Sequence, residues 1–235
     1  MYTQKLSELE KAIGYSFKNK DHLVRALTHS SYSNEAKSRG EMIECNERLE
    51  FLGDSVLSLI VTAYLFERYE NSVEGELSKI RSFTVSEKPL ARYAREIGLG
   101  EYLFLGKGED QTNGRDRPSI ISDAFEALIA AIYLDSGFDA AKEFVLPFAI
   151  KNVDVIEKEH LTIDYKSMLQ QIVQQEQGEI LEYELISESG PAHDREFYVV
   201  AKLNNNRIGS GRGKSKRAAE QNAAKEALKL FGKAE

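Results

Sequence analysis

The stretch NERLEFLGDSVL, Asn46 to Leu57, combines a helical apolar pattern with three carboxylates. An α-helix turns by about 100° per residue, so Glu47, Glu50 and Asp54 fall within about 60° of one another. Acidic neighbours at i,i+3 and i,i+4 repel each other and destabilise an isolated helix. The pattern therefore predicts that something outside this helix requires the three charges.

A second predicted helix, residues 121–137, repeats this combination. The stretch SDAFEALIAAIYLD is apolar nearly all round, yet it carries Asp123 and Glu126 at i,i+3. A helix this apolar is expected to be buried, and an unpaired buried carboxylate is costly. Neither helix has a lysine or arginine at a matching spacing. A divalent cation facing both helices is the simplest neutraliser, and an all-oxygen ligand set favours Mg²⁺ or Mn²⁺.

Other interpretations of these carboxylates fit the sequence less well. A lone pair of glutamates at i,i+3 is usually a solvated helix face, but the apolar flanking residues leave little room for one. A di-iron bundle needs two Glu-x-x-His motifs, and the single one runs from Glu157 to His160. His22, His29 and His193 are scattered, and no Ser-His-Asp or Cys-His constellation is indicated. Chemistry by a metal-activated water fits better than a side-chain nucleophile.

Length and composition favour a globular protein of two domains. The chain has 235 residues, of which 42% are hydrophobic and 29% charged. No uninterrupted apolar run reaches the roughly 18 residues of a membrane span, and residues 1–17 contain no apolar signal-peptide core. We therefore expect a cytoplasmic protein without membrane association. Cys45 is the single cysteine, which excludes an internal disulfide and a cysteine-based zinc site.

The charge is unevenly distributed along the chain. The net charge of −7 alone argues against nucleic acid as a partner. Residues 163–235, however, hold 11 Lys and Arg and 11 Asp and Glu, so they are neutral. The whole chain has 31 Lys and Arg and 38 Asp and Glu. Residues 1–162 therefore hold 20 basic and 27 acidic residues and carry the whole net charge. An acidic first part and a neutral second part with clustered bases indicate different roles.

The apolar periodicity also changes along the chain. Residues 1–150 show apolar residues at three- and four-residue steps, which predicts an all-α domain. Residues 151–162 are charged and weakly patterned and are predicted to be a linker, with room for a short helical continuation. Residues 163–235 are predicted to form an α-β-β-β-α domain from an amphipathic helix, alternating stretches with turn signals, and an alanine-rich helix. Helices of the first domain are predicted at residues 6–14, 21–32, 49–69, 74–85, 87–98, 121–137 and 138–150.

These stretches resemble the ribonuclease III family. NERLEFLGDSVL is similar to the family signature almost residue for residue, and LTHSSY, EGELSKIRS and PSIISDAFEALIAAIYLDSG resemble its other blocks in the same order. The resemblance covers roughly residues 5–233 and implies Mg²⁺-dependent cleavage of double-stranded RNA, with Mn²⁺ as a substitute. It implies 5′-phosphate and 3′-hydroxyl ends, processing of ribosomal, messenger and other RNA precursors, and no small-molecule organic cofactor.

The resemblance assigns roles to the carboxylates. It places metal binding and catalysis on the acidic residues of the two apolar helices, and it adds further acidic positions that line the same cleft. The implied metal ligands are Glu50, Asp123 and Glu126, the catalytic residues are Asp54 and Glu126, and the secondary cleft residues are Glu47 and Glu74.

The resemblance also implies a homodimer with two sites that cut the two RNA strands at a short stagger. Phe51 matches the family's interface aromatic, which inserts into a pocket of the partner. Plain core packing is the other interpretation of Phe51. Gly53 fits a close approach of helices, either within the subunit or across the dimer.

Residues 163–235 resemble a double-stranded RNA-binding domain. GPAHDREF is similar to its strand 1–2 loop, and GSGRGKSKRAAEQNAA is similar to the start of its final helix. Bases at a helix N-terminus suit phosphate, and short polar side chains on one helix face suit the minor groove of A-form RNA. Glu220 stands where many such domains have a third base, which predicts weaker RNA affinity. The implied RNA-binding residues are Ser167, Gln170, Gln174, His193, Lys214, Lys216 and Arg217.

Two other functions remain open on sequence grounds. A degenerate relative would bind RNA without cutting it, although all four principal carboxylates are present here. A metal-dependent hydrolase of small phosphate compounds would have little use for a C-terminal RNA-binding domain. Histidine chemistry of the ribonuclease A kind would leave cyclic phosphate ends, so end-group analysis separates it.

Overall fold

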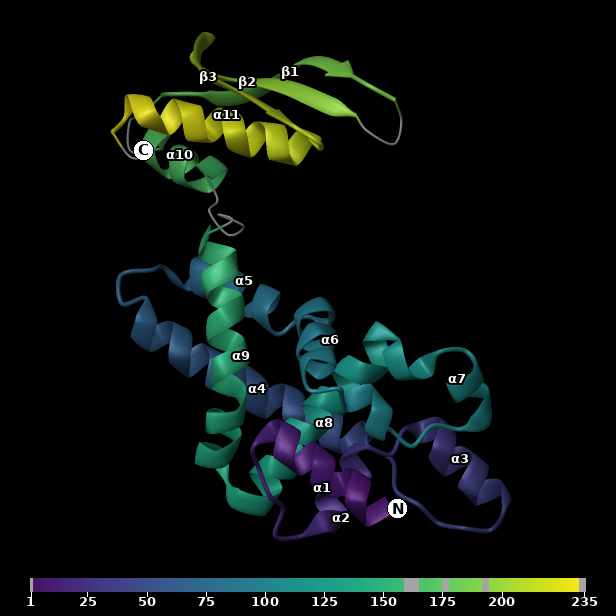
Figure 1. Ribbon diagram of the computed structural model, residues 1–235. Helices are drawn as coiled ribbons and strands as arrows, with labels where there is room; N and C mark the ends of the chain where they lie inside the picture. The colour runs from purple at the N-terminus through teal and green to yellow at the C-terminus, as the bar shows by residue number, and fades with distance from the viewer. Residues whose placement is uncertain (1, 159–164, 175–177, 192–194, 233–235) are drawn as a thin grey trace. The chain divides into compact units, whose positions relative to one another are not determined.

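The chain forms two compact units, Met1–Thr162 and Ile163–Glu235, in the computed structural model (Figure 1). Each unit has its own hydrophobic core. The first unit is helical, and the second combines two helices with a small sheet, which confirms the predicted fold class. The structure describes residues 2–158, 165–174, 178–191 and 195–232.

The first unit is built from helices joined by short connections. Its longest members are α4, α8 and α9, which pack against one another. Its elements are α1 (Tyr2–Ile13), α2 (Lys20–Ala26), α3 (Ser30–Ser38), α4 (Glu47–Arg68), α5 (Glu74–Thr84), α6 (Glu87–Glu96), the 3₁₀ turn η1 (Leu99–Tyr102), α7 (Lys107–Gln111), the 3₁₀ turn η2 (Gly114–Asp116), α8 (Pro118–Ser136) and α9 (Phe138–Lys158).

Helices α4 and α8 form the centre of this unit. Helix α8 is buried along most of its length, from Ile120 to Ile132, whereas α4 has a buried side and an exposed side. Among the helices of the described residues, α4 alone is long and apolar enough to cross a membrane, a test that core helices of soluble proteins also pass. Gly53 of α4 lies so close to α8 that a Cβ atom would overlap the carbonyl oxygen of Glu126.

Residues 21–32 form parts of two helices instead of the single helix that periodicity predicts. Phe104 interrupts them: its N–H donates to the Leu27 carbonyl at 2.8 Å, and its carbonyl accepts the His29 N–H at 3.1 Å. These tertiary hydrogen bonds replace bonds that a continuous helix would make. The His29 ring then accepts the Ser31 N–H at 3.2 Å and caps the start of α3.

The predicted linker begins too early, because α9 continues to Lys158. Val153 and Ile156 are buried in the core of the helical unit. Residues 151–158 are therefore the last two turns of a core helix. The remainder of the predicted linker, 159–162, lies outside the described residues.

The end of α9 is held by Arg68, in the last turn of α4. The Arg68 guanidinium donates to Asp154 at 2.9 Å and to Glu157 at 2.8 Å, and it lies over the rings of Tyr64 and Tyr69. Asp154 and Glu157, which the sequence predicts to be solvated residues of a linker, are thus both ion-pair partners of Arg68. This pairing explains why the charged sequence forms an ordered helix end.

The second unit places two helices on one face of an antiparallel sheet with strand order β1-β2-β3 (Figure 1). Asn204 and Asn205 have positive φ values of 49° and 67° and form the two-residue turn between β2 and β3. The elements are α10 (Tyr165–Val173), β1 (Leu181–Ser189), β2 (Glu196–Leu203), β3 (Asn206–Gly213) and α11 (Lys216–Leu230).

Alternate glycines on β3 bring α11 onto the sheet. A Cβ atom at Gly209, Gly211 or Gly213 would overlap the backbone of α11. Ala219 and Ala223 are fully buried on the α11 side of this contact. Because these three glycines have no side chains, α11 packs close to the sheet, and this packing positions the cationic residues at the helix start.

Candidate active site and RNA-binding surface

Three carboxylates from two helices converge where α4 crosses α8. Glu50 comes from α4, and Asp123 and Glu126 come from α8. One oxygen of each lies within 4.8 Å of the others, and all three side chains are half-buried. The contact between Gly53 and the Glu126 backbone allows this convergence, because it lets the two helix axes approach closely. The sequence prediction that these two acidic helices face each other is thus met in the structure.

The electrostatics of this cluster oppose ionisation. Burial is the largest cause of the raised pKa of Glu126, which reaches about 8. The charges of Asp54, Asp123 and Glu50 raise it further. Burial and neighbouring carboxylates also raise the pKa of Glu50. Burial likewise raises the pKa of Asp123, partly opposed by a hydrogen bond from Ser122. Such clustered oxygens match the ligand preference of a divalent cation.

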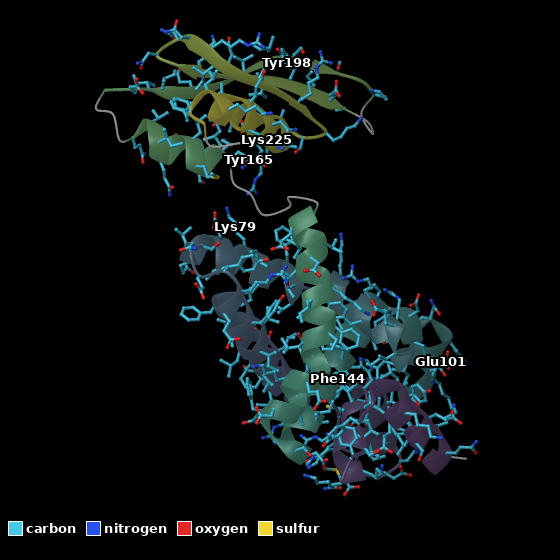
Figure 2. All side chains as sticks on the ribbon, turned by 60° about the vertical axis from the view of Figure 1, so that its left-hand side comes forward. Lys79, Glu101, Phe144, Tyr165, Tyr198 and Lys225 are labelled. Atoms are coloured by element: carbon cyan, nitrogen blue, oxygen red, sulfur yellow. The ribbon has the colours of Figure 1, made fainter. Side chains whose placement is uncertain are left out.

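An aromatic cluster packs around Phe125, in the turn of α8 that carries the two carboxylates. Phe125, between the two α8 carboxylates in sequence, is 1% exposed. Its ring centroid lies 5.8 Å from that of Tyr93, 5.5 Å from that of Phe144 and 5.6 Å from that of Phe148. Figure 2 labels Phe144 near the middle of the helical unit. This apolar packing holds in the core the turn of α8 that carries Asp123 and Glu126.

The other acidic residues of α4 lie at the edge of the cluster. Asp54 is exposed, and its charge is the largest cause of the raised pKa of Glu126 after burial. Glu47 is exposed at the start of α4, and its charge contributes to the raised pKa of Glu50. Both residues therefore face solvent beside the buried oxygens.

Glu74 is not part of this cluster within one chain. Its carboxylate accepts the Ser78 hydroxyl at 2.7 Å at the start of α5. It lines a separate pocket together with Phe66 and Arg81. The prediction that Glu74 lines the same cleft is therefore not met in the single chain, because α5 begins beyond the far end of α4.

Phe51 lies on an exposed apolar stripe rather than in the core. Its side chain is 80% exposed, and those of Leu59 and Phe66 are 57% and 74% exposed. At about 100° per residue, the three positions fall within about 80° on α4. The core-packing interpretation of Phe51 is thus excluded for the single chain. An apolar stripe of this size on a globular surface indicates an interaction site.

Sequence reasoning missed a histidine near the acidic cluster. His29 lies at the start of α3, where its Nδ1 atom contacts the Ser31 hydroxyl at 2.8 Å. Its charge lowers the pKa of Asp123, against the larger effect of burial. His29 is part of the LTHSSY block, but it is far from Asp123 in sequence, so no spacing rule could predict that the two residues are close.

The predicted RNA-binding residues that the structure describes lie on α10 and α11 or directly beside these helices. Ser167 and Gln170 are exposed on α10, and Gln174 is exposed one residue beyond its end. Lys216 and Arg217 are exposed in the first turn of α11, directly after the N-cap Ser215. Lys214 is exposed between β3 and α11, and His193 lies outside the described residues.

Comparison with known proteins agrees with both units. The family described as Ribonuclease-III-like matches residues 19–153, and the double-stranded RNA binding motif matches residues 165–230. Ribonuclease 3 of Clostridium perfringens is 46% identical over 228 residues, covering 97% of this chain and 94% of that protein. Ribonuclease 3 of Clostridium tetani is 48% identical over 223 residues, covering 95% and 93%.

A solved structure resembles the helical unit. It is the nuclease domain of ribonuclease III from Campylobacter jejuni, described for structural flexibility in a region involved in dimer formation. The match has a TM-score of 0.56 and 43% sequence identity, and it covers 62% of this chain and 96% of that domain. Sequence motifs, fold and acidic cluster thus lead to one assignment. The chain belongs to the ribonuclease III family of endoribonucleases and carries a double-stranded RNA-binding domain after its nuclease domain.

Proposed function

We propose that this chain cleaves double-stranded RNA with a divalent cation held by Glu50, Asp123 and Glu126. Mg²⁺ is the proposed ion, with Mn²⁺ as a substitute, because both prefer carboxylate oxygens. The observation that carries the proposal is the convergence of three half-buried carboxylates from two helices within 4.8 Å. The pKa values of Glu50 and Glu126 are raised because ionising these side chains here is electrostatically unfavourable. A bound cation would remove this cost.

The half-buried carboxylates would hold the cation, and the exposed carboxylates beside them would contact water and RNA. When bound, the cation supplies an activated water and stabilises the oxygen that leaves phosphorus. Asp54 is exposed beside the cluster and would accept a hydrogen bond from the attacking water. Attack of water on phosphorus, with departure of the 3′ oxygen and its protonation, leaves a 5′-phosphate and a 3′-hydroxyl. Glu47 would line the approach of the RNA.

We infer that the nuclease domain acts as a homodimer through the exposed stripe of α4. Phe51 would enter the pocket lined by Phe66, Leu77 and Arg81 on a second copy. Glu74 lines that pocket, so its predicted place in an RNA cleft requires the second copy. Two copies related by a two-fold axis would present two acidic sites to the two strands of a duplex.

The second unit would supply most of the affinity for RNA. Lys214, Lys216 and Arg217 lie at the start of α11, where backbone N–H groups also favour phosphate. Ser167 and Gln170 on α10 suit 2′-hydroxyls and base edges of the minor groove, and Gln174 extends this surface. His193, which lies outside the described residues, remains a proposed RNA-binding residue.

The biological setting follows from the family assignment. Precursors of ribosomal and messenger RNA are proposed substrates, and the cytoplasm is the proposed location. No small-molecule organic cofactor is proposed, because the carboxylates and a cation suffice for hydrolysis.

One experiment separates this proposal from its alternatives. Purified protein is incubated with a long RNA duplex in Mg²⁺ and then in EDTA, and the product ends are identified. Short duplexes with 5′-phosphate and 3′-hydroxyl ends, formed only with Mg²⁺, support the proposal. Binding without cleavage would indicate a binding module, cyclic phosphate ends would indicate histidine chemistry, and cleavage of small phosphate esters alone would indicate another hydrolase.

A further inference from the structure

Glu220 and Lys166 join the two RNA-facing helices of the second unit. Lys166 Nζ lies 2.7 Å from Glu220 Oε2, which links the first turn of α10 to α11. The Glu220 side chain is 15% exposed and that of Lys166 is 33% exposed. Glu220 therefore points toward α10 and not into solvent, where a phosphate would lie.

Neighbouring contacts support the same junction. The Lys166 ammonium lies 4.6 Å from the ring centroid of Tyr183 on β1. The Lys166 backbone N–H donates to the Gln221 side chain at 3.3 Å, which satisfies a donor at the start of α10. On the next turn of α11, Lys225 lies 5.4 Å from the ring centroid of Tyr165. Figure 2 shows Tyr165 and Lys225 on the same side of the sheet, opposite Tyr198.

The junction lies between the two groups of proposed RNA-binding residues. Ser167 follows Lys166 directly on α10, and Arg217 is three residues before Glu220 on α11. A duplex of fixed A-form geometry can contact both helices only if their separation and angle match it. The glycine contacts fix α11 to β3, and the apolar side of α10 is buried in the same core. The Lys166–Glu220 pair adds a fixed point at the first turn of α10.

We propose that Glu220 is a positioning residue for RNA binding, which acts by pairing with Lys166. In this interpretation Glu220 does not face the RNA, and Lys166 neutralises its charge within the protein. This assignment rests on the proposed RNA-binding role of the second unit. It reverses the expectation that Glu220, standing where many such domains have a third base, weakens RNA affinity.

The two interpretations predict opposite results for Glu220→Lys. If Glu220 repels phosphate, the new lysine adds a phosphate contact, tightens binding and steepens the slope of log affinity against log salt by about 0.9. If Glu220 positions α10, the new lysine faces Lys166 and repels it. Duplex affinity should then fall by roughly three- to tenfold despite the added positive charge, with little change in the salt slope.

The experiment measures binding of a long RNA duplex by the full chain in EDTA over a range of salt concentrations. Glu182→Lys is the matched control, because Glu182 is exposed on β1 and the change in charge is the same. Glu220→Gln tests loss of the pair without repulsion and should give a smaller decrease. Thermal melting of each variant establishes that binding is measured on folded protein.

The charge-swapped double variant Lys166→Glu with Glu220→Lys decides between positioning and simple charge. The swap restores an ion pair between α10 and α11, so it should recover most of the affinity that Glu220→Lys loses. Tighter binding by Glu220→Lys with a steeper salt slope, or behaviour equal to Glu182→Lys, would overturn the inference. Absence of duplex binding by the unaltered chain would instead refute the proposed function of the second unit.

Discussion

Gly53 of α4 lies directly against the backbone carbonyl of Glu126 in α8, with no space for a Cβ atom between them. Glu50 and Asp54 are on the same helix, within one turn of Gly53, and Asp123 is one turn before Glu126. The helix contact and the acidic cluster are therefore one feature. Any change that separates the helices also separates the carboxylates.

Gly53→Ala should damage both stability and cleavage. The added methyl group would overlap backbone atoms that have no rotamer with which to move away, so the helices must shift. We expect a loss of about 1–3 kcal/mol in the free energy of unfolding, as for other overpacked sites. Cleavage in Mg²⁺ should fall more than the melting temperature explains. Gly108→Ala is the control, since nothing lies within 4 Å of a Cβ at that position and it should be tolerated.

The metal-free protein should lose stability as pH rises through the pKa of Glu126. That pKa is about 8 in the folded chain, above the ordinary value of 4.5. The fold therefore favours the protonated form: this contribution is fully present below about 4.5 and is lost as pH approaches about 8. Melting in EDTA across this range should show a decline for the unaltered protein that is shallower for Glu126→Gln. Parallel curves for the two proteins would contradict the placement of Glu126 in a repulsive cluster.

The double variant Phe51→Ala with Phe66→Ala should dissociate the proposed dimer. These side chains are 80% and 74% exposed in the single chain, and a second copy would cover them. Sedimentation at micromolar concentration should show a dimer for the unaltered protein and a monomer for the double variant. Leu134→Ala removes a 48% exposed leucine from α8 and should leave the dimer intact. A monomeric unaltered chain would contradict the proposed dimer.

Truncation should distinguish the predicted domain boundary from the observed end of α9. A fragment of residues 1–150 lacks the buried Val153 and Ile156 and both acidic partners of Arg68. Full burial of one such apolar side chain stabilises by about 1.5–3 kcal/mol. The fragment 1–150 should therefore melt well below the fragment 1–162. Equal melting temperatures would mean that the last two turns of α9 contribute nothing to the nuclease domain.

Periodicity predicted the helices wherever burial alone decides the structure. It failed at residues 21–32, because Phe104 supplies backbone hydrogen bonds from a distant part of the chain. It also failed to predict the last two turns of α9, after residue 150. Asp154 and Glu157 suggest a solvated segment there, but the fold pairs both with Arg68 of α4. Both errors come from tertiary contacts that local sequence does not contain.

The acidic cluster was predictable because charge on an apolar helix is expensive wherever the helix is buried. The sequence could not decide whether Phe51 is a core or an interface residue, since both require an apolar side chain at that position. The ion pair of Glu220 could not be predicted from the sequence either. Its partner Lys166 is 54 residues away in sequence, and only the fold shows that the two charges meet.

The most direct test of the metal-dependent mechanism is Glu126→Gln, measured for RNA binding and cleavage on the same preparation. Glutamine keeps the size and one oxygen of the side chain but removes the charge that would hold the cation, whereas Glu143→Gln makes the same change at an exposed position of α9. The Glu126 variant should bind duplex as the unaltered protein does and lose most of its cleavage in Mg²⁺, while the Glu143 variant retains both. Near-normal cleavage by Glu126→Gln would contradict the role of this carboxylate cluster in catalysis.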